Sequence, residues 1–277
     1  MARPPLDDRY VQARSGLLDA LGALGPLRAA TVLVGAQAVY EHTREQDNDF
    51  AVAPFTYDAD VALQPELLAD DPRILDAMAS AGFSLTGQPG LYINAQGIQV
   101  DLLVPERLGG RRGRGAGLGV HGDRAARQVR GLEGALVCNA LFTIAALGIE
   151  DDRAYEIRVA GPAALVVAKV HKIVERIDAP RRGDDLDKDA FDVFRLLRAV
   201  ETAPLAEEFG TLLASGISRT VTEEALSHVP RLFASSDRAG TALVARHLAR
   251  LQPEETVREA VVALTRDLLE QLQAGDG

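Results

Sequence analysis

The spacing of apolar residues predicts well-defined elements at the start of the chain. Between positions 8 and 24, apolar residues recur with the period of an amphipathic helix. A short apolar run rich in β-branched residues then occupies 30–34 and ends at Gly35, and a helical pattern follows over 36–42. We therefore expect a helix, followed by a strand that turns at a glycine directly into a second helix.

The next part of the chain has the pattern of short strands separated by turns. The polar segment 44–55, which contains Pro54, is predicted to be a loop. The remaining elements are expected in this order: a strand at 57–63, a helix at 65–81, a hairpin of strands at 91–95 and 99–105 around Gly97, a flexible Gly- and Arg-rich loop at 107–131, and short strands at 135–146 and 154–159.

The pattern changes at Gly161, and the rest of the chain is helical. Pro162 suits the first turn of a helix. Helices are expected at 163–177, 188–200, 205–214, 222–233, 241–251 and 254–273. The sequence thus predicts a unit of strands and helices over 1–160, followed by an all-helical unit over 161–277.

Composition indicates a folded protein in a reducing compartment. Hydrophobic residues make up 47% and charged residues 25% of the 277 residues, which argues against a disordered chain. The single cysteine, Cys138, excludes an internal disulfide. No apolar run reaches the length of a membrane span, and the first residues lack the apolar core of a signal peptide. We expect a soluble, cytoplasmic protein that has no membrane partner.

Charge is distributed unevenly along the sequence. The net charge of −10 argues against a protein that binds duplex nucleic acid, although residues 107–130 hold seven Arg and one Asp. The only lysines are Lys169, Lys172 and Lys188. In a chain so biased toward Arg, lysine is expected where a flexible ammonium is needed rather than a planar guanidinium. A basic strip beside acidic segments favours chemistry on metal-bound phosphates.

Three aspartates are candidates for a metal site. Strand alternation places Asp58 and Asp60 on one face of the strand at 57–63, and Asp101 points away from the apolar face of its own strand. If these strands pair, the three carboxylates converge. A divalent cation that prefers oxygen ligands, Mg²⁺ (or Mn²⁺), would then relieve their repulsion. The alternative is that each aspartate is a solvated residue at a strand end.

A second polar set lies on two predicted helices. Lys169, Lys172 and Arg176 follow one helix face, and Lys169 lies in its most apolar part, where an ammonium needs an anionic partner. Asp189 and Asp192 share a face of the next helix. Taken singly, these residues are the ordinary charges of exposed helices.

Four elements, in this order, resemble the AbiEii/MenT group of nucleotidyltransferase toxins. They are the Gly35-Ala36 turn with Asp58-x-Asp60, the lone Asp101, Lys169 through Arg176, and Lys188-Asp189-x-x-Asp192. The resemblance covers about residues 30–200. It implies a polymerase-β-like nucleotidyltransferase domain, α+β with a small mixed sheet, followed by an all-helical domain.

The sequence departs from the family pattern at three points. Ala36 stands where a serine hydroxyl would contact the triphosphate, and the spacing from Gly35 to Asp58 is longer than usual. Leu186 takes the place of an arginine, for which Arg181 or Arg182 could substitute. These departures concern nucleotide affinity and choice more than the fold.

The resemblance implies an enzyme that transfers a nucleoside monophosphate from an NTP to an acceptor hydroxyl. In some relatives the acceptor is the 3′ end of tRNA, and the enzyme is the toxin of a toxin–antitoxin pair with a cognate antitoxin. Two Mg²⁺ ions bridged by Asp58 and Asp60 would stabilise the charge of the reacting phosphates. Asp101 would complete the second metal site or act as general base.

The remaining roles also follow from the resemblance. Lys169 would pair with the triphosphate, and Lys188 with Asp189 would orient the base or sugar, or support Lys169. The Arg-rich strip 107–130 would follow RNA phosphates, unless it is only a solvated loop. The residues implied in catalysis are Asp58, Asp60, Asp101, Lys169 and Asp189, and those implied in nucleotide binding are Gly35, Ala36, Thr56, Lys172, Arg176, Lys188 and Asp192. Thr56 also matches a hydroxyl that an antitoxin phosphorylates in some relatives.

Two other functions are open from the sequence. One is a nucleotidyltransferase for small molecules of the aminoglycoside type, which shares the paired aspartates and a helical second domain. The other is a catalytically inactive nucleotidyltransferase fold that serves as a binding module, a reading favoured by Ala36 and Leu186.

Overall fold

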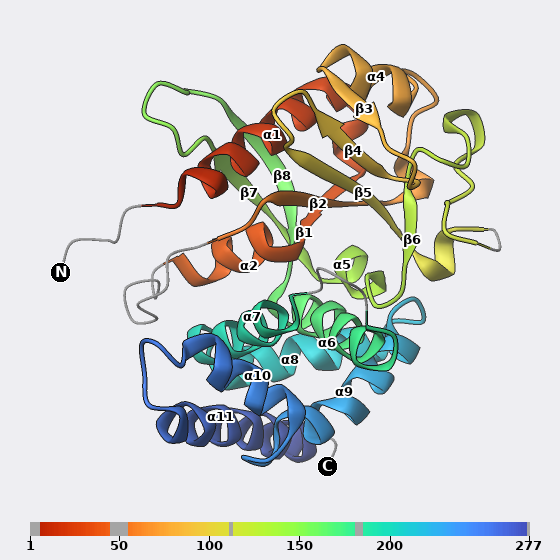
Figure 1. The fold of residues 1–277 in the computed structure, drawn as a ribbon. Helices are drawn as coiled ribbons and strands as arrows, with labels where there is room; N and C mark the ends of the chain where they lie inside the picture. The colour runs from red at the N-terminus through yellow and green to blue at the C-terminus, as the bar shows by residue number, and fades with distance from the viewer. Residues whose placement is uncertain (1–5, 45–54, 111–112, 181–184, 276–277) are drawn as a thin grey trace.

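The computed structural model describes residues 6–44, 55–110, 113–180 and 185–275. It is an α+β protein with a mixed central sheet and a mostly helical C-terminal part (Figure 1). The predicted loop at 44–55 falls mainly on residues outside this description, as do Arg181 and Arg182.

The N-terminal elements form in the order that the apolar pattern predicts. They are α1 (Asp8–Leu24), a 3₁₀ turn (Gly25–Ala30), β1 (Thr31–Val34), α2 (Gly35–Thr43) and β2 (Asp58–Leu63). Asp7 caps α1 by accepting a hydrogen bond from the backbone N–H of Arg9. Helix α1 packs across β2, β5 and β8.

The described strands form one sheet of eight, in the order β3-β4-β5-β2-β1-β8-β7, with β6 paired to β5. The strands not yet given are β3 (Phe83–Leu85), β4 (Leu91–Asn94), β5 (Gln99–Pro105), β6 (Arg127–Val129), β7 (Asn139–Ala145) and β8 (Ala154–Ala160). Strand β2 is antiparallel to β1 and parallel to β5. The predicted hairpin around Gly97 is confirmed by the antiparallel pairing of β4 with β5.

The C-terminal part is helical, as predicted. Its helices are α6 (Pro162–Asp178), α7 (Leu186–Ala199), α8 (Thr202–Ala214), α9 (Arg219–Phe233), α10 (Ala239–Leu248) and α11 (Glu254–Gly275). Helices α6 and α7 pack against α2 and join the helical layer to the sheet (Figure 1). Within the described residues, no helix combines the length and apolar composition needed to cross a membrane.

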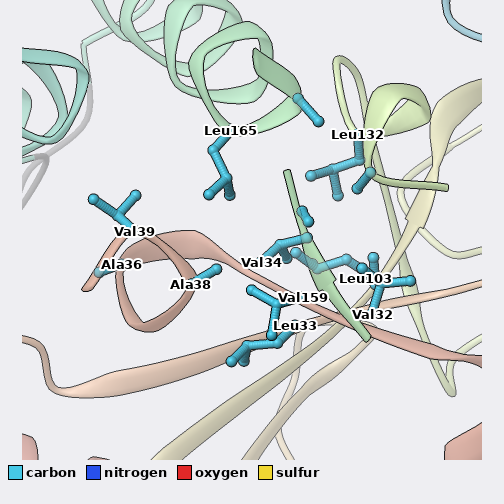
Figure 2. Packing of buried hydrophobic residues seen from close by; sticks show 14 of the residues in the cluster. Val32, Leu33, Val34, Ala36, Ala38, Val39, Leu103, Leu132, Val159 and Leu165 are labelled. Carbon is cyan, nitrogen blue, oxygen red and sulfur yellow. The ribbon is translucent and has the colours of Figure 1, made fainter. Parts of the chain in front are cut away.

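One hydrophobic core runs through both parts of the chain. Val34 of β1, Val159 of β8 and Leu165 of α6 are each at most 1% exposed and belong to one cluster. Figure 2 shows Leu165 pointing toward the strands that carry the two valines. The change from sheet to helices falls between Ala160 and Pro162. The division into two units at residue 161 stays a prediction, because the packing is continuous across it.

The helix predicted at 65–81 is wrong in its first half. That segment contains a 3₁₀ turn, Pro65–Leu67, and the helix α4 is only Ile74–Ser80. Pro72 disfavours a helical backbone at Asp71, so a helix cannot run through this position. The apolar spacing across the proline is therefore shared by two separate elements. Strand β3, which follows α4 directly, was not predicted.

The segment 107–131 is irregular but packed, so the prediction of a flexible loop is wrong for its described part. Strand β6 pairs in parallel with the end of β5, and Ala116, Ala125 and Ala126 are fully buried. Small side chains let this backbone lie close against the sheet without the periodic pattern that marks a strand. The strand predicted at 135–146 is also shorter, because α5 (Glu133–Val137) occupies its first residues.

Candidate active site

The sheet brings the candidate carboxylates together. In the parallel pairing of β2 with β5, Asp58 lies opposite Gln99 and Asp60 lies opposite Asp101. Asp60 also lies opposite Val34 of β1, the residue before the Gly35 turn. The pairing on which the predicted convergence depends is therefore confirmed.

The Gly35 turn is shaped around the carboxylate of Asp60. Gly35 has φ +68°, and a Cβ built on it would come within 2.8 Å of the Asp60 Cγ and overlap Oδ2. Only glycine allows both this backbone conformation and this approach. Helix α2 begins at Gly35, so Asp60 lies beside a helix N-terminus, which favours negative charge. The next residue, Ala36, is buried.

We expect Gly35→Ala to lower the free energy of unfolding by at least about 2 kcal/mol, because it combines a strained φ with an overlap on Asp60. Gly97→Ala is the matched control. Gly97 has φ +81° but nothing lies within 4 Å of its added Cβ, so about 1 kcal/mol is expected. Urea unfolding of the two variants measures the difference. Equal losses in the free energy of unfolding would show that the close approach of Asp60 to the Gly35 turn does not contribute.

Burial raises the pKa of two carboxyls of the site, Asp60 and Asp101. Burial, followed by repulsion from Asp58, raises the pKa of Asp60 to about 6, although Lys172 lowers it. Burial also raises the pKa of Asp101, against the opposing effect of Arg127. A cation bound at the site would therefore stabilise the charged forms of Asp60 and Asp101.

Asp58 is fixed by two contacts. The hydroxyl of Thr56 donates a hydrogen bond of 2.6 Å to Asp58 Oδ1. The side chain of Gln37 donates to the Asp58 carbonyl at 3.1 Å, and Gln37 in turn accepts from Arg14 Nε at 2.8 Å. Thr56 is only 2% exposed, so a kinase could reach its hydroxyl only if this part of the chain opened.

Arg14 and Gln37 were missed by the sequence reasoning. Arg14 is 1% exposed and also contacts Glu41 and the Tyr10 hydroxyl. The signal was present in the sequence, since a charged residue on the apolar face of the 8–24 helix needs a buried partner. These contacts tie α1, α2 and the first residue of β2 together.

Asp101 is held by a residue of the Arg-rich segment. The guanidinium of Arg127 contacts Asp101 through both Nε and Nη2. In the described part of the chain, no three His, Cys, Asp or Glu side chains gather closely enough to hold a metal ion. The three-carboxylate centre expected from the sequence is thus not assembled, since Asp101 is paired with a guanidinium.

Asp58 and Asp60 still fit a divalent cation. Both are half-buried carboxylates on one face of β2, and the charge on Asp60 is disfavoured by burial and by the nearby charge of Asp58. Mg²⁺ is often held by one or two carboxylates together with water and phosphate oxygens. Two carboxylates are enough for one such ion.

Helices α6 and α7 meet through a buried ionic cluster. Lys169 Nζ lies 2.8 Å from Asp189 Oδ1 and 2.6 Å from Asp192 Oδ2. Arg176 also contacts Asp189, as does Lys172 Nζ at 3.3 Å. The predicted shared faces of the two helices are confirmed by these contacts. Lys188 Nζ lies 3.8 Å from Asp192 Oδ2.

The cluster keeps its members charged. Burial lowers the pKa of Lys169, but Asp189 and Asp192 outweigh burial and raise it above its usual value. Burial likewise raises the pKa of Asp189, and the surrounding cations, Lys169 first, bring it well below its usual range. The Lys169 side chain is 5% exposed. Its ammonium is therefore shielded from solvent and contacts the two aspartates.

Lys172 lies between the ionic cluster and the carboxylate strands. Its charge lowers the pKa of Asp60 and of Asp101, while its ammonium contacts Asp189. The side chain is 43% exposed, compared with 23% for Arg176 and 17% for Lys188. Lys172 is therefore the most accessible cation of this cluster for a phosphate.

The pKa of Asp60 predicts how metal binding depends on pH. Mg²⁺ or Mn²⁺ is expected to raise the Tm at about pH 7.5 and to have little effect at about pH 5, because the Asp60 carboxyl is protonated below its pKa of about 6. Thermal unfolding with metal and with EDTA at both pH values measures this. A Tm increase of the same size at both would contradict the prediction.

Some arginines of the Arg-rich strip form ion pairs and hydrogen bonds within the molecule. Arg130 pairs with Glu224 of α9 and with Glu106, and Arg124 donates to the backbone carbonyls of Thr86 and Gly87. Arg107 and Arg114 are exposed. The described part of the segment therefore holds exposed arginines as well as Arg127, which contacts Asp101.

Comparisons of the chain with protein-family models, with curated proteins and with solved structures found no match.

Proposed function

We propose that this protein is a metal-dependent nucleotidyltransferase with a polymerase-β-like fold, related to the AbiEii/MenT group. One observation carries the proposal: Asp60 lies over the Gly35 turn and opposite Asp101 on a parallel neighbouring strand, with Lys172 near both. A glycine turn before a helix, beside paired carboxylates and a lysine, suits the binding of a metal-bound triphosphate.

Different residues of the chain would hold the metal, bind the triphosphate and accept the proton of the acceptor. Asp58 and Asp60 would hold Mg²⁺ or Mn²⁺, which supplies charge stabilisation to the reacting phosphates of an NTP. Lys172 and Arg176 bind triphosphate oxygens, and backbone N–H groups at the start of α2 add to this binding. Asp101 accepts the proton of the acceptor hydroxyl. Lys169 fixes Asp189 and Asp192, and through them the arrangement of α6 and α7.

The acceptor we favour is the 3′ end of tRNA, with the protein acting as a cytoplasmic toxin opposed by a cognate antitoxin. The support is the exposed position of Arg107 and Arg114 in the same segment that carries Arg127. Exposed arginines can bind the phosphates of an RNA backbone, and binding of this kind weakens steeply with salt.

The test is transfer of label from each α-³²P-labelled NTP to total tRNA or to a panel of aminoglycosides. We expect one NTP to label tRNA in the presence of Mg²⁺, and Asp58→Ala to abolish labelling. Asp76→Asn, an exposed aspartate on α4, is the matched control and should keep full activity.

The outcomes separate the candidate functions. Labelled aminoglycoside with unlabelled tRNA would favour the small-molecule enzyme. An inactive binding module is favoured by the pairing of Asp101 with Arg127 and by Ala36. It would be supported if no acceptor is labelled and Asp58→Ala leaves inhibition of cell growth unchanged.

A further inference from the structure

Arg127 reaches the carboxylate site from a strand that the sequence did not reveal. It lies opposite Leu103 in the parallel pairing of β6 with β5. Its guanidinium contacts Asp101 through Nε at 3.4 Å and through Nη2. The Arg127 side chain is 29% exposed and that of Asp101 is 14% exposed. A two-point, largely shielded pair of this kind is stronger than a surface ion pair.

The backbone around Arg127 is fixed on both sides. A Cβ on Gly90 would come within 2.6 Å of the Arg127 backbone nitrogen, which shows how closely the segments before β4 and at β6 are packed. On the other side, Gly115 forms a β-bridge with Arg127, and Gln128 donates to the Arg114 carbonyl at 2.8 Å. The guanidinium is therefore delivered by a packed strand rather than by a loose loop.

Arg127 supplies positive charge at Asp101, the carboxylate that lies opposite Asp60. Burial lowers the pKa of its guanidinium, but Asp101 and, more weakly, Asp60 raise it above its usual value. A guanidinium stays protonated and has no free lone pair for a metal ion. It therefore cannot ligate a metal ion itself, and its fixed positive charge opposes the binding of a metal ion at Asp101.

We propose that Arg127 takes the place of a second divalent cation at Asp101, so that the protein without nucleotide binds one such ion, at Asp58 and Asp60. This rests on the nucleotidyltransferase function proposed above. It makes Arg127 a positioning residue, which holds Asp101 beside Asp60, instead of an RNA-binding member of the Arg-rich strip.

The experiment counts Mn²⁺ ions bound to the full chain without nucleotide, by electron paramagnetic resonance of free Mn²⁺ at about pH 7.5. We expect one ion for the wild type and two for Arg127→Met, which removes the competing charge and leaves an apolar side chain of similar length. Arg127→Lys keeps a positive charge and should bind one. Arg124→Met, the same loss of charge in the exposed part of the strip, should also bind one.

A second variant keeps the proposal testable if Arg127→Met does not fold. Asp101→Asn in the wild-type background should still bind one ion with affinity within about threefold, because Asp101 is not a ligand of that ion. A loss of the ion, or a tenfold loss of affinity, would overturn the proposal. So would two ions in the wild type, or one ion in a folded Arg127→Met.

These outcomes are distinct from a failure of the proposed function. If the wild type binds no Mn²⁺ and transfers no nucleotide, the metal site at Asp58 and Asp60 is wrong, and both proposals fail. If the wild type transfers nucleotide but binds two ions before nucleotide is added, the function stands and only the role of Arg127 is overturned.

Discussion

Asp60→Asn is expected to lower nucleotidyl transfer by at least about 1,000-fold and, at the same time, to stabilise the metal-free protein. An amide cannot supply the charge of a carboxylate ligand, and loss of an interaction that stabilises developing charge typically costs two to three powers of ten or more. The stabilisation has a separate cause. Burial and the neighbouring Asp58 raise the pKa of Asp60 to about 6, so its charged form is disfavoured.

The sign of the stability change depends on pH. A carboxyl whose pKa is raised on folding costs stability as pH rises from its usual pKa to its folded pKa, and the cost is complete above that value. Asp60→Asn should therefore raise the Tm by a few degrees at about pH 7.5 with EDTA present. It should change the Tm much less at about pH 4, where the carboxyl is protonated in the folded state and about half protonated in the unfolded chain.

The control is Asp76→Asn, which changes the same group on exposed α4 and should alter neither activity nor Tm. Activity of Asp60→Asn within tenfold of the wild type would contradict the assignment of Asp60 as a metal ligand. A lower Tm at about pH 7.5 would contradict the electrostatic argument, since the amide would then be losing a favourable contact rather than a repulsion. Stability lost to a functional site in this way is a common compromise.

The part of the site that could be predicted from the sequence depends on local periodicity. Alternation along β2 and β5 fixes the face on which Asp58, Asp60 and Asp101 lie, and helical spacing fixes the shared faces of α6 and α7. These rules need only neighbouring residues. The positions of Gly35 and Pro162 at helix starts follow from backbone geometry in the same way.

The partners of the charged residues could not be predicted in this way. Arg127 was one of seven arginines in a segment without periodicity, and only the pairing of β6 with β5 brings it to Asp101. Lys169 was expected to face a triphosphate, but the register of α6 against α7 places it between two aspartates. Contacts between distant segments depend on packing, which the local pattern does not encode.

The second large effect is expected at Lys169. Lys169→Met keeps the length of the side chain but removes the ammonium that bridges Asp189 and Asp192. Removing one partner of a buried ion pair costs about 3–5 kcal/mol, because the remaining charge stays buried. We expect a loss of this size in the free energy of unfolding, measured in urea, together with loss of transfer activity through disorder of the cluster.

The two aspartates should differ in how far their neutralisation rescues this loss. Asp189 keeps Lys172 and Arg176, whereas Asp192 keeps Lys188 at 3.8 Å, and Asp192 Oδ1 has no hydrogen-bond partner among the residues that the structure describes. The uncompensated charge in Lys169→Met is therefore mainly that of Asp192. Adding Asp192→Asn should recover more stability than adding Asp189→Asn, which would also remove the negative charge that Lys172 and Arg176 contact. Equal recovery, or greater recovery with Asp189→Asn, would show that the cluster shares its charge evenly and that Lys169 is not the specific partner of Asp192.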